Sequence, residues 1–101
     1  MELPRKGILI VYNQAYGDEM IALVEGLGQR GFTRFDGVGG RGSKTGIPHL
    51  DSHAWPEYND ALMLLAEDEK VPQILAALRE KDAATPELGI KAFSWKVEDI
   101  L

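Results

Sequence analysis

The chain has 101 residues, a mass of 11.2 kDa, a formal net charge of −5 and no cysteine. Without cysteine it has no disulfide framework, thiolate metal site or cysteine nucleophile. The acidic balance argues against nucleic acid as a partner, because binding to phosphates needs a basic surface. No apolar run approaches the roughly 18 residues needed to cross a bilayer. We therefore expect a single folded domain over residues 1–101, located in the cytoplasm.

The first third of the chain predicts a strand, a helix and a second strand. Residues 7–12 are a continuous apolar run rich in β-branched side chains, typical of a strand covered on both faces. Asp18 is suited to cap the following helix, and Gly31 to end it. Residues 32–38 form the second strand, with glycines at both ends of the run. The apolar stripe of the helix consists of Met20, Ile21, Val24 and Leu27.

The last 44 residues predict a further strand, a helix and a final strand. Residues 58–66 favour a strand, and Asp68 is a candidate cap for the helix that follows. Pro72 lies near the first turn of that helix, where its missing N–H costs little, and the helix ends before Thr85-Pro86. Its stripe consists of Val71, Ile74, Leu75 and Leu78. Residues 89–97 alternate, with one face formed by Lys91, Phe93, Trp95 and Val97.

This order of elements, βαββαβ, is typical of the α+β ferredoxin-like sandwich. That fold has a four-stranded antiparallel sheet with two helices on one face. Two helices cover only one face of the sheet, yet residues 7–12 and 58–66 are apolar at nearly every position. An uncovered second face would exceed the few hundred Å² of apolar patch that monomers tolerate. The sequence therefore predicts a homo-oligomer that packs through the open face of the sheet.

The stretch from 39 to 56 carries the most functional information. Five of the eleven glycines lie between residues 37 and 46, and irregular loops beyond about 12–15 residues are uncommon unless they are functional or disordered. Gly39 and Gly40 would let backbone N–H groups approach an anion, while Arg41 and Lys44 neutralise its charge. The alternative is a connector whose basic side chains contact only water.

The same stretch holds both histidines, in the string His49-x-Asp51-x-His53. In an extended segment alternate side chains point the same way, so these three could meet at one ion. Imidazole together with carboxylate suits Zn²⁺, Cu²⁺ or Ni²⁺. The alternative is that histidines in a polar loop bind nothing.

Two runs carry a resemblance to a known family. Residues 27–46, LGQRGFTRFDGVGGRGSKTG, and residues 89–101, GIKAFSWKVEDIL, resemble the PII signal-transduction family of nitrogen regulatory proteins. The resemblance implies a homotrimer of ferredoxin-like subunits that is no enzyme. ATP, ADP or another nucleotide would bind as a small effector in the clefts between subunits, and the 39–56 loop would engage a membrane transporter or a regulatory protein. It implies ligand-binding roles for Gly39, Gly40, Arg41 and Lys44, and, in the second glycine segment ATPELGIK, for Gly89 and Lys91.

Two other functions remain open on the sequence. A metal-binding or metal-tolerance protein similar to the trimeric CutA family would use His49, Asp51 and His53. A small enzyme on this scaffold, such as a cofactor-independent oxygenase, would need a pocket between helices and sheet. No residue demands such a pocket, and no Ser-His-Asp set or isolated pair of carboxylates can be assembled, so we expect no catalytic residue.

Overall fold

The structure, a computed structural model, describes residues 5–39 and 58–101. Within these ranges the chain forms four strands, two helices and three short 3₁₀ turns in the predicted order. The strands and helices are β1 (Arg5–Asn13), α1 (Gly17–Gly26), β2 (Thr33–Val38), β3 (Asn59–Glu67), α2 (Val71–Ala84) and β4 (Lys91–Lys96). The 3₁₀ turns are η1 (Gln14–Tyr16), η2 (Asp68–Lys70) and η3 (Pro86–Leu88). None of the helices in the described ranges is long and apolar enough to span a membrane.

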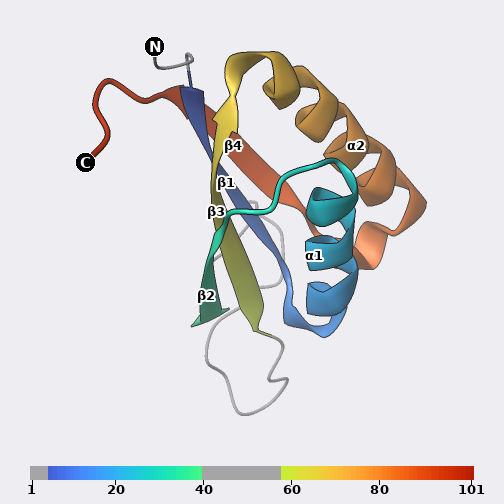
Figure 1. Ribbon diagram of the computed structural model, residues 1–101. Helices are drawn as coiled ribbons and strands as arrows, with labels where there is room; N and C mark the ends of the chain where they lie inside the picture. The colour runs from blue at the N-terminus through green and yellow to red at the C-terminus, as the bar shows by residue number, and fades with distance from the viewer. Residues whose placement is uncertain (1–4, 40–57) are drawn as a thin grey trace.

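The four strands form one sheet in the order β2-β3-β1-β4, with every neighbouring pair antiparallel. Both helices pack against the same face of this sheet (Figure 1). The predicted ferredoxin-like fold is therefore confirmed. The two strands that are apolar at nearly every position, β1 and β3, are the two central strands of the sheet.

The core lies between the sheet and the two helices. Alternation along β1 turns Ile8, Ile10 and Tyr12 toward the helices, and none of the three is exposed. Leu88, in η3, is also fully buried and closes the core beside α2. The other large buried side chains come from β3 and from the predicted stripes of the helices: Leu62, Leu64, Met20, Val24, Val71, Ile74 and Leu78.

Three expectations about helix ends were wrong. Asp18 does not cap α1, because the helix begins at Gly17 and Asp18 lies inside its first turn. The helix ends at Gly26 rather than at Gly31, since Gly28 already turns the chain away with φ +88°. Asp68 begins the 3₁₀ turn η2, and α2 starts three residues later at Val71. Acidic residues thus lie near both helix starts, where the helix dipole favours them without a side-chain cap.

The face of the sheet opposite the helices carries large apolar side chains on all four strands. Phe35, Met63, Phe93 and Trp95 are 42%, 38%, 59% and 43% exposed, respectively. The register places Trp95 opposite Gly7 and Phe93 opposite Leu9, so these side chains share one face as the alternation predicted. A contiguous apolar surface of this kind on a small domain marks an interaction site.

Candidate ligand-binding site

The site predicted from the glycine segments lies at one end of the sheet, where β1 and β2 end and β3 and β4 begin. The register sets Val38 beside Asn59, Asn59 beside Asn13, and Val11 beside Lys91. Gly39 follows directly after β2, and Lys91 is the first residue of β4. This end of the sheet, which we call the loop edge, therefore holds both Gly39, from the first glycine segment, and Lys91, from the second.

A buried carboxylate organises the β2–β3 half of the loop edge. Asp60 is 1% exposed, and its Oδ1 accepts hydrogen bonds from the Gly37 N–H at 3.0 Å and from Gln14 Nε2 at 3.1 Å. The guanidinium of Arg34 lies 4.0 Å from Oδ2 and also contacts Asp36 at 2.6 Å. Gly37 has φ +64° within an irregular stretch of β2, a conformation that favours glycine. The carboxylate thus fixes the last residues of β2 against η1.

Tyr58, the first described residue before β3, is hydrogen-bonded to η1. Gln14 N–H donates to the Tyr58 carbonyl at 2.9 Å, and the Asn13 side chain accepts from the Ala15 N–H at 3.0 Å. Gln14 therefore binds Tyr58 through its backbone and Asp60 through its side chain. The residues that precede and follow 40–57 are both tied to η1, through Gly37 with Asp60 on one side and Tyr58 on the other.

Tyr12 lies beside this carboxylate in the core. Its side chain is fully buried, and its hydroxyl has no hydrogen-bond partner among the described residues. Burial, reinforced by the negative charge of Asp60 and opposed by Arg34, raises the pKa of the Tyr12 phenol above its ordinary value. The phenol is therefore neutral near pH 7, and it places near the loop edge a hydroxyl donor that no residue of 5–39 or 58–101 accepts from.

Hydrogen bonds within the chain hold the second glycine segment in place. Gly89 adopts φ +57° after η3, and its N–H donates to the Pro86 carbonyl at 3.1 Å. The Ile90 N–H donates to Asp82 Oδ1 at 3.1 Å, and Asn13 Nδ2 donates to the Glu87 carbonyl at 3.4 Å. Gly89 consequently supplies the turn, while its own N–H is already used. The exposed Lys91 is the group in this segment that can meet a negative charge.

Gly39 and Lys91 lie at the same end of the sheet but are far apart across its width. β2 and β4 are the outer strands of the sheet, three strand spacings apart, which is roughly 14 Å. Gly39 and Lys91 of one copy cannot therefore meet on a single small ion. Contact with both requires an elongated ligand or residues from a neighbouring copy.

The remaining predicted site residues lie outside the described ranges. These are Gly40, Arg41, Lys44, His49, Asp51 and His53, all within 40–57. In residues 5–39 and 58–101 no three histidine, aspartate or glutamate side chains cluster as metal ligands would. Phe93 and Trp95, which the alternation placed on one face of the last strand, lie exposed on the open face.

Sequence reasoning missed the Asp60 cluster. The available signal was a carboxylate placed second in the strand run NDALMLLAE, where an unpaired charge would be costly to bury. Its partners come from two other segments, Gln14 from η1 and Arg34 and Gly37 from β2, and only the tertiary fold brings them together.

The chain matches no family model and no curated protein sequence. Solved structures with the same fold include a protein of Thermus thermophilus designated as a PII-like signalling protein, at 24% identity and a TM-score of 0.68. That match covers 94% of this chain and 88% of the other. The nitrogen regulatory PII-like protein CPII of Thiomonas intermedia K12, bound to ADP, AMP and bicarbonate, matches at 18% identity and a TM-score of 0.71, covering 93% and 90%.

A third match is a functionally unknown protein of Pediococcus pentosaceus ATCC 25745, at 14% identity and a TM-score of 0.62, covering 99% of this chain and 98% of the other. These matches span nearly the full length of both partners, and two of the three carry the PII-like name. The chain therefore has the ferredoxin-like fold that is found in PII-like signalling proteins.

Proposed function

We propose that this chain is a divergent PII-like regulatory protein, without enzymatic activity, that acts in the cytoplasm as a homotrimer. The observation that carries the proposal is the match of fold to PII-like proteins over almost the whole of both chains. The apolar open face supports the assembly, because Phe35, Met63, Phe93 and Trp95 would otherwise stay in water.

The ligand proposed for the loop edge is a small anion of the nucleotide type, bound between copies. Gly39, Gly40, Arg41 and Lys44 would hold it from the first glycine segment, with Lys91 adding a positive charge from the second. The separation of these segments across the sheet favours an elongated ligand over a single small ion. The Gly89 N–H already donates to the Pro86 carbonyl, so it is not available to a ligand. The second segment would therefore contribute the turn and the Lys91 ammonium rather than a set of backbone N–H donors.

Regulation would follow from the position of residues 39–56 between the two anchored ends. Ligand contacts at Arg41 and Lys44 would restrict the conformations of this glycine-rich segment. Less conformational entropy would then be lost when a partner binds. A partner protein, such as a membrane transporter or a regulatory protein, would then distinguish the loaded from the empty form.

Thermal unfolding with nucleotides tests the proposal. ATP, ADP or AMP at about 100 times its Kd should stabilise the protein by roughly 2.7 kcal/mol. The shift should shrink in Arg41→Ala/Lys44→Ala and in Lys91→Ala. Lys96→Ala is the matched control, since Lys96 is exposed at the opposite end of the same strand. The absence of a shift with every nucleotide, or equal shifts in all variants, would contradict the proposed ligand.

The metal-binding alternative rests on the string His49, Asp51 and His53, which lies outside the described ranges. The same assay with Zn²⁺ and Cu²⁺ tests it directly. A metal shift that disappears in His49→Ala/His53→Ala, together with no response to nucleotides, would favour that function over the nucleotide-binding one.

A further inference from the structure

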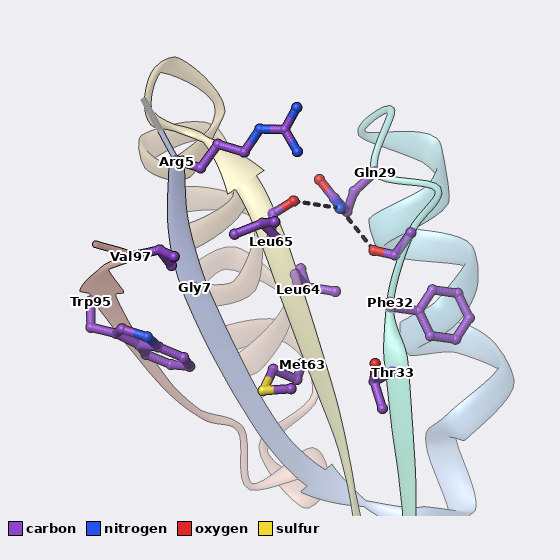
Figure 2. A pocket seen from close by; sticks show the side chains of 11 residues that line it. Arg5, Gly7, Gln29, Phe32, Thr33, Met63, Leu64, Leu65, Trp95 and Val97 are labelled. Carbon is purple, nitrogen blue, oxygen red and sulfur yellow. Dashed lines mark hydrogen bonds between the residues drawn. The ribbon is translucent and has the colours of Figure 1, made fainter. Parts of the chain in front are cut away.

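A groove of about 470 Å³ crosses the open face at the end of the sheet farthest from the loop edge. Here β1 and β2 begin while β3 and β4 end. Trp95 forms one wall, and the other lies along Phe32 and Thr33 (Figure 2). The base is apolar, formed by Gly7, Met63 and Leu65.

The rim of the groove is polar and positive. Gln29 Nε2 donates to the carbonyls of Leu65 at 3.2 Å and Gly31 at 2.8 Å. Leu65 lies beyond the residues of β3 that pair with β2, so the Gln29 side chain takes the place of a strand partner there. The Arg5 guanidinium extends over the groove toward Gln29 (Figure 2) and has no ion-pair partner in residues 5–39 and 58–101. An occupant should therefore combine apolar side chains with negative charge.

Residues 97–101, which we call the acidic segment, have that composition. Val97 N–H still donates to the Arg5 carbonyl at 3.4 Å, and beyond it Glu98, Asp99, Ile100 and Leu101 are all exposed. The segment leaves β4 on the side opposite the helices and points away from the sheet (Figure 1). Its apolar pair, Ile100 and Leu101, thus lacks a surface within its own copy.

We propose that the acidic segment of one copy docks in the groove of the next copy. Glu98 and Asp99 would approach the Arg5 guanidinium at the rim while Ile100 packs between Trp95 and Met63. Four extended residues reach about 13 Å, close to the width of three strand spacings. The contact joins two different surfaces of identical chains, so each copy both donates a segment and receives one, and such contacts close into a ring when the rotation allows. The inference rests on the assembly through the open face proposed above.

Cross-linking between two chains tests the contact, since the protein has no cysteine of its own. Full-length Met63→Cys and Ile100→Cys chains, mixed and mildly oxidised, should form a reducible covalent dimer in clear excess over either chain alone. Mixing Arg79→Cys with Ile100→Cys is the control, because Arg79 is exposed on the helix side. Thr33→Cys, on the opposite wall, replaces Met63→Cys if that variant fails to fold.

An independent variant tests the energetics. Ile100→Asp should weaken self-association at least tenfold in sedimentation equilibrium. Arg5→Glu should weaken it several-fold, and adding Glu98→Lys/Asp99→Lys to that variant should recover much of the loss. Arg79→Glu changes the charge equally and should leave association unchanged.

The outcomes separate this inference from the proposed assembly. If the chain associates but the mixed cysteines cross-link no better than the control, the docking is wrong and the assembly stands. If a chain with both cysteines closes only on itself, the segment belongs to its own groove and the inference is overturned. If the wild-type chain is monomeric, both fail.

Discussion

The contact between Gly7 and Trp95 gives the sharpest test of the open face as described. A Cβ on Gly7 would lie 2.4 Å from two carbons of the Trp95 ring and 2.9 Å from its nitrogen, distances that real side chains essentially never show. Gly7→Ala must therefore push the rigid indole away. Overpacking of this kind costs about 1–3 kcal/mol, partly offset by the roughly 0.5–1 kcal/mol that alanine gains over glycine in a strand.

We expect Gly7→Ala to lower the unfolding free energy by about 1–2 kcal/mol. That corresponds to roughly 5–10 °C in Tm for a chain of this size, measured at one fixed protein concentration. In a Trp95→Ala background the same change should be neutral or stabilising by up to about 1 kcal/mol, which makes the coupling energy of the double-mutant cycle about 2 kcal/mol. Gly26→Ala is the control, because nothing lies within 4 Å of its added Cβ. A Gly7→Ala protein that melts no lower than wild type, or a Gly7→Ala effect of the same size in both backgrounds, would refute the stacking of Trp95 on β1.

Three further predictions concern the loop edge. Tyr12→Phe removes a buried hydroxyl without a described partner, so it should stabilise the protein by up to about 2 kcal/mol in chemical denaturation. The folded protein holds the Tyr12 pKa above that of the unfolded chain, so wild-type stability should fall as pH rises past about 10. Tyr12→Phe should lessen that fall, and the same dependence of stability on pH in both proteins would contradict the raised pKa. Asp60→Ala should cost about 2–4 kcal/mol because it leaves the Gly37 N–H and the Gln14 amide without their acceptor, whereas a loss below about 0.5 kcal/mol would mean that water replaces the carboxylate. Gly89→Ala should lower Tm by several degrees, since φ +57° costs a residue with a Cβ about 1–2 kcal/mol; an unchanged Tm would show that the turn relaxes.

Periodicity in the sequence was enough to predict the fold. Alternation put Phe93 and Trp95 on one face, and the three- and four-residue spacing of Ile74 and Leu78 marked the buried side of α2. The need for cover on both faces of residues 7–12 and 58–66 is explained by their central places in the sheet. These properties depend on which side chains are buried, and the spacing of apolar residues in a single sequence indicates that.

Helix ends and the site were less accessible for a physical reason. Capping depends on the backbone angles of one or two residues, so composition could not show that α1 ends at Gly26, before the turn at Gly28, rather than at Gly31. The Asp60 cluster depends on the register between strands far apart in the chain, and so does the distance between Gly39 and Lys91. Both segments of the loop edge were predicted, but the buried carboxylate that fixes one of them was not.

Sedimentation equilibrium of the full-length chain at micromolar concentration tests the account most directly. We predict a particle of three times the 11.2 kDa chain mass, which dissociates when Phe93→Glu places a charge on the open face. A wild-type chain that sediments at 11.2 kDa throughout, with its apolar face bare in water, would contradict the account.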